Sequence, residues 1–142
     1  MEGNCIFCRI VKGEIPSRAL YEDDDVLAFL DANPLSPGHT LIVPKTHHQF
    51  LENTPESLSA SVFAAVRELA PRIRSAVDAD AHTIAVNDGP AAGQEVPHLH
   101  VHVVPRFEGD GGGPIHAITG DRPDLSDGEM DELEADIRDA AE

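Results

Sequence analysis

The run HLHVHVVPR at residues 98–106 constrains the fold more than any other part of the chain. Successive side chains of a β-strand point to opposite faces, so His98, His100 and His102 would share one face at spacings of about 7 Å. The intervening apolar side chains would share the other face and pack on the core. The run therefore predicts a strand with its apolar face inward and its imidazole row directed toward something open or polar.

The remaining patterns predict more strands around one long helix. Apolar segments at 18–21 and 25–30 flank the acidic turn EDDD and predict a hairpin, and HTLIVPK and HTIAVND predict two further strands. CIFCRIVKGEI predicts a short helical turn ending at Gly13. Strands before and between helices, joined mostly by short links, indicate an α+β fold with an antiparallel sheet.

The long helix should follow Thr54 as N-cap and Pro55 as first helical residue. Its apolar residues recur at helical spacing, and Pro71 should kink it. They are Leu58, Val62, Val66, Leu69, Ile73 and Val77. Ser126 and Glu129 form a capping box for a last helix. We expect that helix to turn Met130, Leu133 and Ile137 inward.

Charge is the unusual feature of the composition. The chain of 142 residues has 26 acidic and 10 basic residues, a net charge of −16, and its only lysines are Lys12 and Lys45. Such a surface repels phosphate backbones, so nucleic acid is an unfavourable partner. Because the acidic residues are distributed along the chain, we expect adaptation to a high-salt cytoplasm that screens self-repulsion.

The length suits one domain, and no segment is typical of a membrane span or of a secretion signal. The only two cysteines stand close together in CIFC, which is not typical of a disulfide framework. These features predict a cytoplasmic protein with reduced thiols.

The loop before the histidine run favours binding of an anion. In NDGPAAGQEVP, Gly89 and Gly93 let the backbone approach a ligand, and backbone N–H groups in such a turn form an anion nest. A nest beside imidazoles suggests a phosphate held by donors and attacked by a ring nitrogen. Two other interpretations remain: a solvated strand face that happens to use histidine, and a purely metal-binding row.

The pattern His-φ-His-φ-His-φ-φ, with φ apolar, resembles the signature of the histidine triad (HIT) family of nucleotide hydrolases and transferases. The resemblance extends over about residues 4–107. It is closest to the Hint-like branch common in prokaryotes, with the Fhit-like branch second. It implies a HIT-like fold, a single HIT domain over 1–142 whose residues 108–142 form a loop and C-terminal helix, and a homodimer with a sheet continuous across its interface.

The resemblance also implies roles for individual residues. His100 would be the nucleophile that takes the nucleoside 5′-phosphoryl group, with His102 and His39 beside it. Asp31 would hold the ribose hydroxyls. His102 and the Asn87 side chain would be phosphate ligands with the Gly93 backbone beside them, and Gln94 would be a further substrate-binding position. The walls of the purine slot would be Ile6, Phe7, Ile10 and Phe29. Without the family, Asp31 could be a turn former, His39 a buried structural histidine, and the apolar positions plain core.

One position departs from the family pattern. Hint enzymes of the animal type have a serine where this chain has Glu95, and that serine contacts the leaving group. A glutamate is larger and normally anionic, so the preferred leaving group is open at this point.

The CxxC pair Cys5–Cys8 resembles half of a zinc site. Many prokaryotic members combine it with the histidine of PKTH and the first histidine of the triad, here His47 and His98. Cys₂His₂ is a sound tetrahedral set for structural Zn²⁺. The alternatives are two reduced thiols near the core and His48 in place of His47.

The resulting prediction is an enzyme that hydrolyses purine nucleoside 5′-phosphoramidates or related phosphoryl conjugates through a nucleotidyl-histidine. The first alternative is cleavage of dinucleoside polyphosphates. The second is a nucleotide-binding module without turnover.

Overall fold

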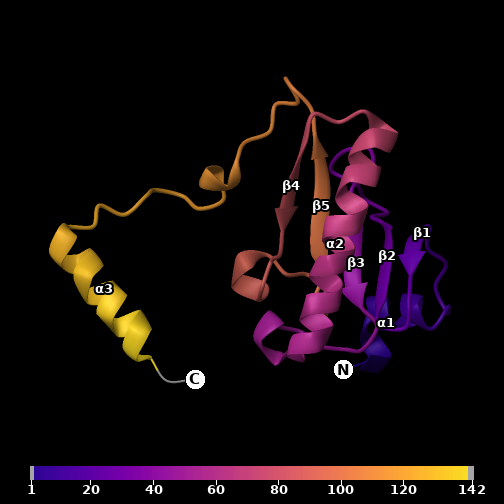
Figure 1. The fold of residues 1–142 in the computed structure, drawn as a ribbon, viewed down its shortest axis with the longest axis horizontal. Coiled ribbons are helices and arrows are strands. Elements are labelled where there is room, and N and C mark those ends of the chain that lie inside the picture. The colour runs from indigo at the N-terminus through magenta and orange to yellow at the C-terminus, as the bar shows by residue number, and fades with distance from the viewer. Residues whose placement is uncertain (1, 141–142) are drawn as a thin grey trace. The chain divides into compact units, whose positions relative to one another are not determined.

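The computed structural model describes residues 2–140. The chain divides into two compact units, Met1–Asp110 and Gly111–Glu142, and each is described by itself. The first unit is built on a five-stranded antiparallel sheet in the order β1-β2-β3-β5-β4 (Figure 1). The predicted α+β fold with an antiparallel sheet is confirmed.

The strands and helices of this unit follow the predicted order. The strands are β1 Ala19–Glu22, β2 Val26–Leu30, β3 Thr40–Pro44, β4 Ala81–Ala85 and β5 Val101–Arg106. The helices are α1 Ile6–Val11 and the long α2 Glu56–Val77, with 3₁₀ turns at Glu2–Asn4, Leu51–Asn53 and Pro90–Ala92. Among the described residues, no helix is both long enough and apolar enough to cross a bilayer.

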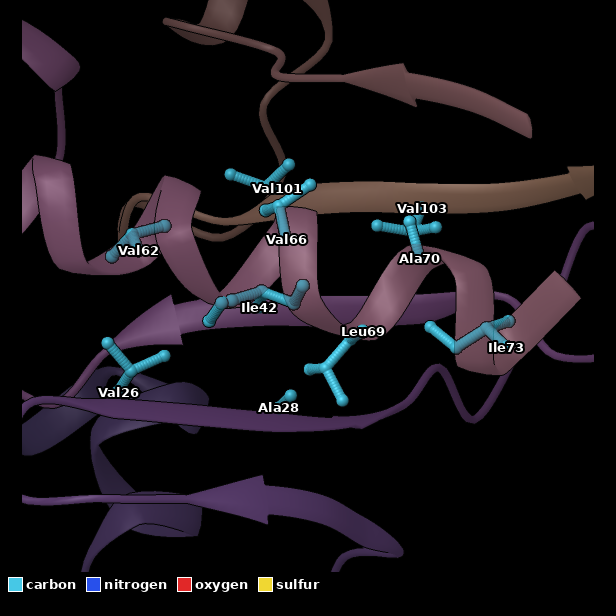
Figure 2. Packing of buried hydrophobic residues seen from close by; sticks show 11 residues of the cluster. Val26, Ala28, Ile42, Val62, Val66, Leu69, Ala70, Ile73, Val101 and Val103 are labelled. Carbon is cyan, nitrogen blue, oxygen red and sulfur yellow. The ribbon is translucent and has the colours of Figure 1, made fainter.

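Helix α2 lies across one face of the sheet and forms the main core with it (Figures 1 and 2). Its apolar stripe meets the residues that alternate toward it on β2, β3 and β5. The contacting side chains include Val62, Val66, Leu69 and Ile73 of the helix and Val26, Ile42, Val101 and Val103 of the sheet.

The opposite face of the sheet is covered by α1. Leu27 and Phe29 of β2, which alternate with the residues facing α2, pack with Phe7 and Cys8 of α1. Burial on both faces explains why β2 and β3 are apolar almost without interruption, where a half-exposed antiparallel strand would alternate. The triad histidines His98, His100 and His102 also point toward the α1 face.

Two local predictions are corrected. The N-cap of α2 is Pro55, not Thr54, because the Thr54 hydroxyl donates to the Phe50 carbonyl at 2.9 Å and closes the preceding turn. Strand β5 begins at Val101, because the amide of Leu99 bonds the His48 carbonyl instead of a neighbouring strand. Helix α2 continues through Pro71.

The second unit contains a 3₁₀ turn at Ile115–Ala117 and helix α3 Asp127–Asp139. The predicted capping box is confirmed: the Ser126 hydroxyl accepts from the Glu129 amide, and the Glu129 carboxylate accepts from the Ser126 amide. The inward orientation predicted for Met130, Leu133 and Ile137 is wrong, since these side chains remain 44–73% exposed. Helical spacing places them on one face of α3, and the described residues of the second unit do not bury that face.

Candidate active site and metal centre

A cavity of about 500 Å³ opens on the α1 face of the sheet. One wall is apolar and comes from α1 and β2, and the other carries the triad histidines and the loop before β5. Nearly all of the predicted substrate-binding residues line it: Ile6, Phe7, Ile10, Phe29, Asp31, Asn87 and Gly93, together with His100 and His102.

His100 presents one free ring nitrogen beside the apolar wall. Its Nδ1 donates to the carbonyl of His98 at 2.7 Å, so the Nε2 of the neutral ring carries a lone pair. The ring packs edge-on against Phe7, with centroids 5.0 Å apart. Burial lowers the pKa of His100, which keeps the ring unprotonated and nucleophilic at neutral pH.

His39 and His102 belong to a directed chain of hydrogen bonds. The amide of Leu35 donates to His39 Nδ1 at 3.1 Å, so the proton of a neutral His39 lies on Nε2. That nitrogen is 3.0 Å from His102 Nδ1, which must then accept and carry its own proton on Nε2. The Nε2 atom of His102 is buried and has no partner among the described residues. The chain of bonds thus leaves an N–H donor on a ring that lines the cavity.

Burial also acts on the charge of these rings. It lowers the pKa of His39, and together with neighbouring His100 and His39 it lowers the pKa of His102 to about 4. Both rings are therefore neutral at pH 7. Asp31 adds its Oδ2 at 3.7 Å from His39 Nε2, so a carboxylate and two histidines lie within 4.8 Å of one another. The hydrogen bonds explain why these three side chains lie close together without a metal ion. The Nε2 atom of His39 carries a proton and so has no lone pair for a metal.

Asp31 combines the two roles considered from the sequence. Its Oδ1 accepts from the Asn33 amide at 2.9 Å, as a turn former does. Its Oδ2 remains on the cavity wall beside His39 and is available to hydroxyl groups of a ligand.

The side-chain amide of Gln94 fixes the glycine loop through hydrogen bonds. Gln94 Oε1 accepts from the Gly89 amide at 3.1 Å, and Nε2 donates to the Gln49 carbonyl at 2.9 Å. Gly89 and Gly93 have φ values of 112° and 99°, which only glycine adopts without strain. Gln94 is buried and lies outside the cavity lining, so it positions the loop whose Gly93 reaches the cavity.

The sequence prediction omitted one wall of the cavity. Residues 15–18 contribute Ile15, Pro16, Ser17 and Arg18 to the lining, and Glu95 and Val96 extend it on the loop side. The only signal for Arg18 was its place at the start of the strand segment predicted over 18–21, which does not distinguish a cavity wall from an exposed rim.

The predicted metal ligands form a second, separate cluster behind the cavity. Cys5 and Cys8 come from the start of α1, His47 follows β3, and His98 precedes β5. Their donor atoms all lie within 4.8 Å of one another. Cys5 Sγ lies 3.3 Å and Cys8 Sγ 3.4 Å from His98 Nδ1, and Cys8 Sγ lies 3.3 Å from His47 Nδ1. His48 turns away and bonds Thr46 at 2.9 Å.

The chemistry of this cluster fits a tetrahedral ion. Bonds of about 2.0–2.3 Å in a tetrahedron separate neighbouring ligand atoms by roughly 3.3–3.8 Å, which matches the three contacts. His98 Nε2 donates to the Pro44 carbonyl at 2.8 Å, so its Nδ1 lone pair faces the sulfurs. Burial lowers the pKa of His98 to about 4 and keeps that lone pair free of a proton. The cluster can therefore hold a metal ion.

Comparisons with known proteins agree with this geometry. A model of the HIT domain family matches residues 12–109. Adenylylsulfatase HINT3 of Arabidopsis thaliana is 46% identical over 110 residues, which are 78% of this chain and 56% of that protein. The crystal structure of a HIT family member from Bacillus subtilis has a TM-score of 0.86 and 36% identity, covering 98% of this chain and 99% of that one.

A further solved structure is a zinc-bound histidine triad family protein from Mycobacterium smegmatis. Its TM-score is 0.73 at 37% identity, covering 97% of this chain and 96% of that chain. The matched family model covers more than half of the sequence. The chain therefore belongs to the HIT family, as the histidine pattern predicted, and that family includes nucleotide hydrolases.

Proposed function

We propose that the protein hydrolyses purine nucleoside 5′-phosphoramidates and related nucleoside phosphoryl conjugates through a covalent nucleotidyl group on His100. The observation that carries the proposal is the 2.7 Å bond from His100 Nδ1 to the His98 carbonyl. It fixes the ring and leaves Nε2 as a lone-pair donor beside a cavity of nucleotide size.

The proposed reaction has two displacements at phosphorus. His100 Nε2 forms a bond to phosphorus as the bond to the leaving nitrogen breaks, and that nitrogen takes a proton from solvent and departs as an amine, a proton that the attacking water of the second step returns to solvent. Water then forms a bond to phosphorus, the bond to Nε2 breaks, and the mononucleotide is released. Such a transfer depends mainly on positioning and charge stabilisation.

The surrounding groups support these steps. The N–H on His102 Nε2, the Asn87 side chain and the Gly93 backbone offer donors to the charge on the phosphoryl oxygens. The free Oδ2 of Asp31 suits the ribose hydroxyls. The apolar wall formed by Phe7, Phe29 and their neighbours suits a flat purine ring.

Intact-protein mass spectrometry tests the proposal. Wild type is mixed briefly with adenosine 5′-phosphoramidate, quenched and weighed, beside the variants His100→Gly and His116→Gly. His116 is an exposed histidine of the second unit and serves as the matched control. We expect an adenylyl adduct on wild type and His116→Gly and none on His100→Gly. AMP release by His100→Gly at the wild-type rate would refute the nucleophile.

The same assay can be run with two other substrate classes. Similarity to an adenylylsulfatase favours adenosine 5′-phosphosulfate as a second candidate. Dinucleoside polyphosphates are the Fhit-like alternative. Retained AMP binding with no turnover of any conjugate would instead identify a nucleotide-binding module.

We also propose that the Cys5, Cys8, His47 and His98 cluster holds structural zinc. With four protein ligands no position remains for a substrate, so bound zinc would supply cross-linking and no chemistry. Metal analysis of purified protein tests this: one zinc per chain is expected, and Cys8→Ser should lose it.

The assembly proposed is a homodimer. Strand β4 forms an edge of the sheet with Ile84 48% exposed, and Phe63 on α2 is 40% exposed, so an edge and an apolar helix side chain are both available for pairing. Light scattering tests it, and a monomer mass at micromolar concentration would refute it. The cytoplasmic location and the adaptation to high salt stay predictions from the sequence.

A further inference from the structure

Three polar side chains beside the cavity come from three neighbouring strands. Asp31 directly follows β2, His39 directly precedes β3, and His102 lies within β5. The Asp31 amide donates to the His39 carbonyl at 2.9 Å. Leu41, two residues after His39, is paired with His102 across β3 and β5. The sheet therefore holds one carboxylate and two imidazoles side by side.

The single N–H of the His39 ring faces two acceptors. Its Nε2 lies 3.0 Å from His102 Nδ1 and 3.7 Å from Asp31 Oδ2. The first contact is a hydrogen bond, whereas the second is beyond hydrogen-bond range and acts through the negative charge of the carboxylate. His39 is 2% exposed, so water does little to weaken this attraction. The carboxylate therefore competes with His102 for one donor.

This competition bears on which nitrogen of His102 carries a proton. When His39 donates to Nδ1, the proton of a neutral His102 lies on Nε2, a buried atom without a partner in the described part of the chain. Without that donation the proton can occupy Nδ1, and Nε2 then carries a lone pair instead. A lone pair repels phosphoryl oxygens, whereas an N–H binds them.

A ligand that engages the Asp31 carboxylate changes this balance. Its Oδ1 accepts from the Asn33 amide at 2.9 Å, and its Oδ2 remains on the cavity wall beside His39. Hydroxyl groups that donate to Oδ2 spread its charge and occupy its lone pairs. They therefore weaken the competitor for the His39 N–H.

We propose that His39 is a positioning residue that links the ribose hydroxyls at Asp31 to the phosphoryl donor on His102. Ribose bound at Asp31 commits the His39 N–H to His102, and the N–H on His102 Nε2 is then fixed for the phosphoryl oxygens. The proton of His39 stays on its Nε2 throughout. This inference rests on the function proposed above and adds to it a selection of ribonucleosides that acts on the rate of transfer.

The split between binding and rate distinguishes this link from an ordinary contact. A hydroxyl group that contributed only binding would lower KM and leave the rate at saturation unchanged. The link through His39 predicts a change in the saturated rate of adenylyl transfer to His100. Loss of the hydroxyls should lower that rate about threefold to tenfold, which corresponds to the net worth of about one hydrogen bond.

Quenched-flow measurement of the saturated transfer rate tests the proposal. The substrates are the 5′-phosphoramidates of adenosine and of 2′,3′-dideoxyadenosine, and wild type is compared with His39→Asn, Asp31→Asn and Asp24→Asn. His39→Asn keeps an oxygen that can accept from the Leu35 amide but removes the ring N–H. Asp24 is an exposed carboxylate outside the cavity lining, so its variant controls for the change in net charge.

Wild type and Asp24→Asn should use the ribonucleoside about threefold to tenfold faster than the dideoxynucleoside. His39→Asn should reduce this ratio to about twofold or less, because the link is broken. Asp31→Asn should turn over the dideoxynucleoside at least as fast as wild type, since a neutral amide competes less for the His39 N–H. Equal rates in wild type, or a ratio unchanged in His39→Asn, would overturn the proposal.

A measurement without turnover separates this proposal from the proposed function. The ring N–H of His39 is buried and hydrogen-bonded, so it is protected from exchange and gives a proton NMR signal, which His39→Asn identifies by its loss. AMP should move this signal further downfield than 2′,3′-dideoxy-AMP does. If no conjugate is turned over, the proposed function fails, and the signal still decides the link: an equal response to both nucleotides refutes it.

Discussion

Gly38 gives the most direct test of how the fold supports the site. It has φ +89°, and an added Cβ would lie 2.9 Å from Val77 Cγ1, 3.3 Å from Pro105 Cγ and 3.4 Å from Ile73 Cγ2. The first distance is shorter than any ordinary carbon–carbon contact, and Val77 is β-branched and stiff at χ1. Gly38 also precedes His39, whose ring orients His102.

The cost of Gly38→Ala has two parts. A non-glycine residue at positive φ costs about 1–2 kcal/mol, and forcing a methyl group against packed side chains costs about 1–3 kcal/mol. We therefore expect the free energy of unfolding to fall by about 2–5 kcal/mol. Gly13→Ala is the matched control, because Gly13 has φ +81° but no atom within 4 Å of the added Cβ. It should lose only the backbone part, about 1–2 kcal/mol.

Urea unfolding of both variants, with m-values compared to wild type, measures the difference. Gly38→Ala should also lower kcat on the phosphoramidate, because relief of the contact moves the backbone that carries His39, whereas Gly13→Ala should leave kcat unchanged. Equal destabilisation by the two variants would refute the reasoning, since it would mean that the contact at Gly38 relaxes without cost.

The remaining predictions concern metal, pH and salt. Removing bound metal with a chelator should lower Tm by about 10 °C or more, equivalent to several kcal/mol, and Cys8→Ser should lower Tm while abolishing the response to chelator. Because the folded pKa of His102 lies at about 4, below its ordinary value of 6.5, the folded state binds fewer protons. Its contribution to stability is therefore complete above pH 6.5 and is lost as the pH falls toward 4, and urea midpoints of His102→Gln should decline less over that range than those of wild type. Thermal melts in dilute buffer and in molar KCl should show higher Tm in salt if the net charge of −16 destabilises the fold by self-repulsion, and equal values would contradict it.

Alternation in the sequence predicted the two faces of the histidine run correctly but not its hydrogen bonding. Leu99, Val101 and Val103 are fully buried, and the latter two pack on the α2 side. The first three residues of the run nevertheless lie outside β5, because side-chain alternation reports backbone extension and not the partner of each amide. The predicted open or polar surroundings also fail for His98, which is completely buried against two sulfurs. Periodicity contains no information about sulfurs 90 and 93 residues earlier in the chain.

For the candidate site as well, the sequence predicted some of the residues correctly and others not. Residues tied to a local pattern or to the family resemblance, such as Asp31 and Asn87, line the cavity as expected. Gln94 does not, because its side-chain amide is engaged by the Gly89 amide of its own loop and by the distant Gln49 carbonyl. Arg18 was missed, because a wall made by a segment between two elements leaves no periodic signal. For Gln94 the missing information included a partner 45 residues earlier in the chain.

The alternation of the run also explains how one short segment serves two sites. Neighbouring residues on the same face of an extended segment lie about 7 Å apart, close enough for His98 and His100 to share a backbone hydrogen bond while their rings serve different clusters. His98 gives its ring to the sulfurs of Cys5 and Cys8 and its carbonyl to His100 Nδ1. The Pro44 carbonyl fixes the same His98 ring from the other side. Ordering His98 therefore orders the acceptor that sets the tautomer of His100, and the Cys5, Cys8, His47 and His98 cluster is linked to the cavity by one hydrogen bond.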